Sequence, residues 1–130
     1  MTVLYLPKEL AGIRDQTYIL ADIVNNTAVL TDIMDLELID GYHIGARFLF
    51  QITRRTDTQN IQEVGEVYVS RNRETLVWEA SYDSKLGASG VYFGINQSNL
   101  QLQYQATDLT GANYSGTLTV GNKTYIKDNP

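Results

Sequence analysis

Apolar and polar residues alternate with a period of two along much of this chain, a pattern typical of β-strands that bury one face. The longest segments of this kind are residues 48–58 and 63–70. Alternation places five apolar side chains on a common face: Phe48, Phe50, Ile52, Val67 and Val69. We therefore expect these two segments to form an antiparallel pair at the centre of a β-sandwich.

Shorter apolar runs predict the other strands, at residues 17–24, 28–31, 75–81, 91–95, 100–106, 114–120 and 124–126. The pair Asn25-Asn26 suits a turn, so we expect residues 28–31 to return antiparallel to residues 17–24. Residues 83–90 are predicted to be a Gly/Ser loop, and Gly121-Asn122 a turn. Residues 32–40 fit either a helical face or a strand, with a strand or an irregular crossover favoured.

The clearest alternation lies in residues 100–106, where three glutamines face away from the apolar side chains: Gln101, Gln103 and Gln105. This glutamine face is either an ordinary solvated sheet surface or a partly wet subunit contact. The single tryptophan, Trp78, has apolar neighbours two positions away and is interpreted as a core anchor.

About eight short strands joined by polar turns predict an all-β protein, an antiparallel β-sandwich of the jelly-roll-like or Ig-like kind. A chain of 130 residues is sufficient for one domain, which we place at residues 16–130. Residues 1–15 contain the apolar run Val3, Leu4, Tyr5 and Leu6. This run is interpreted either as an edge strand or as an arm that anchors on a neighbouring subunit.

Composition supports the strand assignment and excludes several classes of partner. Nine tyrosines favour half-exposed sheets, and the two prolines lie near the chain ends. A net charge of −5 and scattered basic residues argue against nucleic acid as a partner. The chain has no cysteine, so its core must stabilise the fold without disulfides. We expect no signal peptide and no membrane segment, because no apolar run has the required length or flanks.

No constellation of residues indicates catalysis, so we expect neither an enzyme nor a cofactor or metal. His43 is the single histidine, and the acidic residues near it lack the spacing of a calcium loop. Glu63 and Glu66 lie three apart on a strand and should point to opposite faces, which argues against a glycosidase pair and favours solvent-facing charges. Neither a nucleophile elbow nor a phosphate-binding glycine loop is present.

Arg54, Arg55 and Asp57 lie where the first central strand leaves the sheet. Solvated charge is the usual explanation for basic residues at a strand end. Their position also suggests a structural loop, in which these side chains fix the connection by charge-assisted hydrogen bonds to backbone carbonyls or carboxylates.

Five segments, taken in order, resemble a β-sandwich domain common in tailed-phage virion proteins. They are residues 50–58 (Phe-Gln-Ile-Thr-Arg-Arg-Thr-Asp-Thr), 63–69 (Glu-Val-Gly-Glu-Val-Tyr-Val), 90–95 (Gly-Val-Tyr-Phe-Gly-Ile), 100–107 (Leu-Gln-Leu-Gln-Tyr-Gln-Ala-Thr) and 114–118 (Tyr-Ser-Gly-Thr-Leu). The resemblance extends over residues 18–120, and the order of the segments carries it.

This resemblance implies a non-enzymatic virion structural protein, such as a capsid decoration or head/tail appendage subunit. Such a subunit would be made in the bacterial host cytoplasm and would attach to the particle. Its partners would be itself, in a homo-oligomer of which a trimer is one form, and other virion proteins.

The alternative is a carbohydrate-binding or receptor-binding module that stacks exposed tyrosines on a surface glycan. Candidates for that role are Tyr82, Tyr92 and Tyr114.

Overall fold

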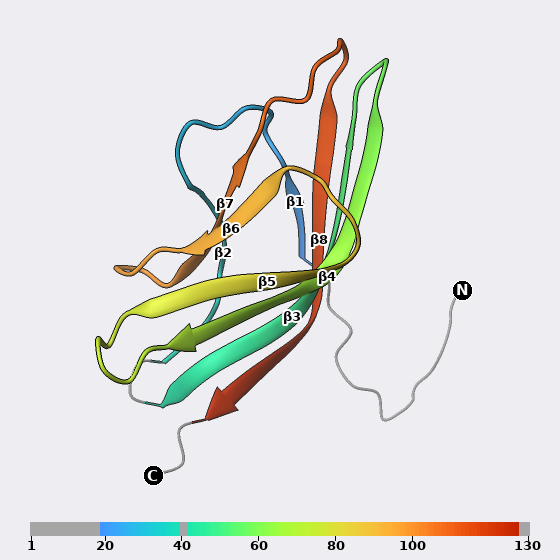
Figure 1. The fold of residues 1–130 in the computed structure, drawn as a ribbon. Coiled ribbons are helices and arrows are strands. Elements are labelled where there is room, and N and C mark those ends of the chain that lie inside the picture. The colour runs from blue at the N-terminus through green and yellow to red at the C-terminus, as the bar shows by residue number, and fades with distance from the viewer. Residues whose placement is uncertain (1–18, 40–41, 128–130) are drawn as a thin grey trace, which may run out of the picture.

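The structure is a computed structural model that describes residues 19–39 and 42–127. These residues form two antiparallel sheets, which confirms the predicted β-sandwich (Figure 1). The larger sheet contains, in spatial order, β1 (Ile19–Asp22), β8 (Ser115–Lys127), β3 (His43–Arg55), β4 (Asn60–Arg71) and β5 (Trp78–Gly87). The smaller sheet contains β2 (Thr31–Asp35), β7 (Gln101–Ala106) and β6 (Val91–Ile95).

The strand order is nested, because β1 pairs with β8 and β2 pairs with β7. This wrapping of the first strands on the last is closer to a jelly roll than to an Ig fold. A meander of β3, β4 and β5 then extends the larger sheet. The nested pairing brings the two ends of the described chain to one side of the larger sheet.

The core lies between the sheets and is centred on the predicted pair. In the β3–β4 register Phe48 lies opposite Val67, and both side chains are buried as expected. Phe50 contacts Phe93 of the smaller sheet, with their ring centroids 5.0 Å apart. Trp78 is also buried, in agreement with its predicted role as a core anchor.

The predicted pairing of residues 28–31 with residues 17–24 is wrong. β1 pairs with β8 in the larger sheet, whereas β2 pairs with β7 in the smaller one. Asn25 and Asn26 do form a turn, with Asn26 at a φ of 56°. That turn carries the chain across to β7, where the Thr27 N–H donates to the Ala106 carbonyl at 3.0 Å. Local turn chemistry could not show which strand the chain would join.

Two predicted loops are also strands. Residues 83–87 belong to β5, an edge strand whose second half is exposed on both faces, so polar residues there resemble a loop. Gly121-Asn122 is an irregularity within the single strand β8, between the pairs Gly121–Leu49 and Thr124–Arg47. Leu76 lies outside β5 in an exposed turn with a φ of 60° and does not share the face of Trp78.

Candidate functional site

Arg54 is the largest fully buried side chain among the described residues, with a relative exposure of 0%. It is therefore not a solvated charge. Its Nη1 donates to the Ser89 carbonyl at 2.7 Å, and its Nη2 donates to the Thr107 carbonyl at 2.6 Å and to Asn25 Oδ1 at 2.8 Å. Its Nε donates to the Tyr114 hydroxyl at 3.1 Å. One guanidinium thus ties β3 to three connections and to the start of β8.

Glu63 is buried beside this cluster, with an exposure of 4%, and the expectation of a solvent-facing charge was wrong for it. Its carboxylate accepts hydrogen bonds from the Ser89 hydroxyl at 2.6 Å and the Ser89 N–H at 3.1 Å. Ser89 in turn offers its carbonyl to Arg54. A buried cation and a buried anion are therefore linked through one serine, which limits the cost of burying each charge.

Arg55 and Asp57 differ from Arg54 in being exposed. The Asp57 carboxylate accepts two hydrogen bonds from the Asn113 side-chain amide, at 2.9 and 3.1 Å. The backbone N–H of Asp57 donates to the Ala112 carbonyl at 2.9 Å. These contacts hold the β3–β4 hairpin against the β7–β8 connection, which extend side by side at the top of Figure 1. The anchoring candidates Val3, Leu4, Tyr5 and Leu6 lie outside the described residues.

The outer face of the larger sheet carries exposed apolar side chains. On β1 and β5, Leu20 is 72% exposed and Leu86 is 64% exposed, and Leu49 and Ile126 are also exposed. The register places Leu20, Thr119, Gln51, Val64 and Leu86 in one row across all five strands. We call this surface the outer face of the larger sheet. Its apolar side chains have no cover within the described residues.

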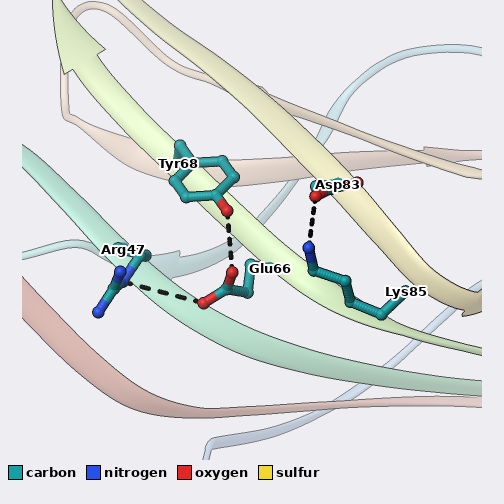
Figure 2. A network of polar contacts seen from close by, with 5 residues as sticks. All are labelled: Arg47, Glu66, Tyr68, Asp83 and Lys85. Carbon is teal, nitrogen blue, oxygen red and sulfur yellow. Dashed lines mark hydrogen bonds and ion pairs between the residues drawn. The ribbon is translucent and has the colours of Figure 1, made fainter.

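A polar network crosses the same face (Figure 2). The Tyr68 hydroxyl donates to Glu66 Oε1 at 2.8 Å, and the Arg47 Nε lies 3.9 Å from Glu66 Oε2. On β5, the Lys85 ammonium donates to Asp83 Oδ2 at 2.7 Å. The hydrogen bond to Glu66 raises the pKa of the Tyr68 phenol, and the hydrogen bond to Asp83 raises the pKa of Lys85. The network contains two cations and two anions, so its net charge is zero.

The face is hollowed beside Gly45. The hollow measures about 490 Å³ and is bordered by Arg47, Tyr68 and Ile126. A Cβ at Gly45 would lie 2.7 Å from the Val69 carbonyl oxygen, so a larger residue would push β4 away.

The outer face of the smaller sheet carries the three glutamines, which are half-buried and not fully solvated. Gln103 donates to Asp32 Oδ1 at 2.8 Å, and Gln105 donates to the Ala28 carbonyl at 3.0 Å. Tyr92 lies directly opposite Gln105 in the β6–β7 register and is 52% exposed. Between them and the Asn25–Asn26 turn lies a shallow hollow of about 280 Å³.

The other two tyrosines proposed for glycan stacking are not free to stack. Tyr82 packs edge-on against Phe50 and Phe93, with centroid distances of 6.2 and 5.4 Å. Burial raises the pKa of the Tyr82 phenol, with a further contribution from the charge of Glu63. The Tyr114 hydroxyl donates to the Ile23 carbonyl at 2.7 Å while it accepts from Arg54.

His43 is partly exposed, and its Nδ1 accepts the Ile39 N–H at 2.9 Å. Within residues 19–39 and 42–127, no three His, Asp or Glu side chains lie close enough to hold a metal ion. The same residues include no helix that is long and apolar enough to cross a membrane.

Sequence reasoning missed the burial of Glu63 and the network of Figure 2. A signal for the network exists in the alternation of Arg47, Glu66, Tyr68 and Asp83 on outward positions. That signal could not be used without the register, which decides which outward residues are neighbours.

Among solved structures, the chain is similar to the tailspike protein of Acinetobacter phage vB_ApiP_P1, with a TM-score of 0.44 and 19% sequence identity. The alignment covers 92% of this chain and 25% of the tailspike chain, so this chain spans about a quarter of that protein's length. No family model and no curated protein matches the sequence.

Proposed function

We propose that this chain is a non-enzymatic structural subunit of a tailed-phage virion, a capsid decoration or head/tail appendage protein that self-associates. The sequence resemblance supports the virion assignment, since its ordered segments fall on β3, β4, β6, β7 and β8. The outer face of the larger sheet supports self-association and is the observation that carries the proposal.

The occupant we propose for that face is a second copy of the same chain. Each copy carries a net charge of −5, so two copies repel one another unless they meet on a surface without excess negative charge. The network on this face supplies two cations, Arg47 and Lys85, and two anions, Glu66 and Asp83. Exposed leucines beside a charge-balanced network provide apolar area to bury and polar contacts that fix the register.

Light scattering on the purified chain tests self-association. We expect a mass that is a multiple of 14.6 kDa. Placing a cation in the apolar surface, as Leu49→Lys or Leu86→Lys, should reduce the mass to that of the monomer because a buried unpaired charge opposes association. The matched control is Val29→Lys, at an exposed apolar position outside this face, which should leave the mass unchanged. A monomeric wild-type chain at high concentration would contradict self-association.

Immunogold labelling of tailed particles with an antibody to the chain tests the virion assignment separately. We expect regular labelling at one position on the particle. Unlabelled particles, from a host that expresses the chain, would contradict the assignment whatever the oligomeric state.

A further inference from the structure

We infer that the hollow beside Tyr92 is a binding site for one pyranose ring of a neutral sugar. The hollow lies on the outer face of the smaller sheet, away from the face proposed for self-association. Its lining residues are Asn26, Thr27, Tyr92, Gln105, Ala106 and Thr107. The site rests on these side chains alone and does not depend on the proposed virion role.

The lining combines one aromatic ring with uncharged polar groups. Tyr92 presents about half of its surface to solvent, and a tyrosine ring is an apolar platform with a hydroxyl at its edge. The Asn26 amide, the Thr107 hydroxyl and Gln105 Oε1 have no hydrogen-bond partner among the described residues. A pyranose has the complementary surface, with C–H groups on one ring face and hydroxyls that both donate and accept around its edge. The absence of a charged lining residue favours a neutral sugar.

The rim of the hollow is held rigidly by the buried cluster beneath it. Arg54 donates to Asn25 Oδ1, and Asn25 is the chain neighbour of the rim residue Asn26. Arg54 also donates to the carbonyl of Thr107, which is itself a rim residue. Thr27 is fixed on both sides, because its N–H donates to the Ala106 carbonyl and its Oγ1 accepts the Ala106 N–H at 2.7 Å. The Gln105 side chain is oriented by its hydrogen bond to the Ala28 carbonyl at 3.0 Å. A rim whose backbone is fixed in this way reduces the ordering cost of binding a small ligand.

A hollow of about 280 Å³ accommodates one ring and buries only part of it, so the affinity should be low. We expect a dissociation constant on the order of 1 mM for a single sugar. Several copies in an oligomer would raise the avidity for a repeating glycan without any new contact.

The test is an NMR titration of the full chain with three neutral probes: methyl glucoside, methyl galactoside and methyl N-acetylglucosaminide. A saturable shift of the amides of residues 26–27, 91–93 and 105–107 is expected for at least one probe. Tyr92→Ala should weaken binding of that probe about tenfold because the stacking platform is lost, whereas Tyr92→Phe keeps the ring face and should retain most of the affinity.

The matched control is Tyr42→Ala, which removes another exposed tyrosine that lies outside the hollow. It should bind the probe as the wild type does. The site assignment fails if no probe gives a saturable shift at these amides, or if Tyr42→Ala and Tyr92→Ala weaken binding equally. Either result would leave the light-scattering test of self-association unaffected.

Discussion

At the residue scale, Arg54 shows how one side chain connects distant parts of the chain. Its partners come from the turns at Asn25, Ser89 and Thr107 and from Tyr114 near the start of β8. Ser89 is buried, Asn25 and Tyr114 are half-buried and Thr107 is exposed, around a guanidinium that itself has no exposure. Removing the cation would leave the buried Ser89 carbonyl without this donor and would break the hydrogen bond to the Thr107 carbonyl.

Arg54→Ala should lower the free energy of unfolding by about 3–5 kcal/mol, since it removes a buried cation that donates four hydrogen bonds. Arg54→Lys should recover only part of the loss, because an ammonium cannot reproduce the planar set of donors. Urea unfolding followed by tryptophan fluorescence measures both. Arg55→Ala is the matched control and should change stability by less than about 0.5 kcal/mol, because Arg55 is exposed. Equal losses for Arg54→Ala and Arg55→Ala would contradict the role of the buried cluster.

At the element scale, the contact between β4 and β5 depends on a glycine at a register shift. Gly65 pairs with Ser84 and Val64 with Leu86, so Lys85 is the extra residue on β5. A Cβ at Gly65 would meet the Asp83 carbonyl oxygen and would come within 2.9 Å of the Phe50 ring. Only glycine allows β5 and the aromatic core to approach β4 this closely.

Gly65→Ala should therefore displace β5 from β4 and lower stability by about 1–3 kcal/mol through overpacking. Hydrogen exchange should show faster exchange of the β5 amides, with little change in β1 or β8. A substitution to alanine at Gln62, which is exposed on the same strand, is the control. Unchanged protection of β5 in Gly65→Ala would refute the close-approach requirement.

At the scale of the whole molecule, three groups make the fold sensitive to alkaline conditions. In the folded chain the pKa values of Tyr68 and Tyr82 are raised above 10.0 and that of Lys85 above 10.5. The unfolded chain thus releases these protons at a lower pH than the folded chain does. Stability is then fully present below the unfolded pKa values and is lost as the pH rises through the folded ones.

We expect the free energy of unfolding to fall as the pH rises above about 10, where the unfolded chain begins to lose these protons. Tyr82→Phe should reduce the slope of this fall most, because Tyr82 is the most buried of the three groups and burial is the main cause of its raised pKa. Tyr68 and Lys85 lie on the surface, where solvent and salt screen their contribution. Denaturant titrations at several pH values measure the slope. A stability that is constant or rises over this range would contradict the assignment.

Much of this architecture can be predicted from the sequence because the period of two is a local property. Alternation in residues 48–58 and 63–70 predicts Phe48, Phe50, Ile52, Val67 and Val69 in the core, and alternation in residues 100–106 predicts Leu102 and Tyr104 there, and all seven are buried. Tyr92 was also singled out as an exposed aromatic, which its position between Val91 and Phe93 requires.

Tertiary structure decided everything that depends on which strands become neighbours. Alternation assigns a side chain to a face but carries no information about the partner strand, so the pairing of β1 with β8 and of β2 with β7 was not predictable. The burial of Arg54 and Glu63 also depends on strand pairing, because a charged residue is buried only when distant carbonyls and hydroxyls meet around it. The sequence thus determined the strands and their inward faces, and the pairing of those strands decided where the charges, the hollows and the exposed leucines came together.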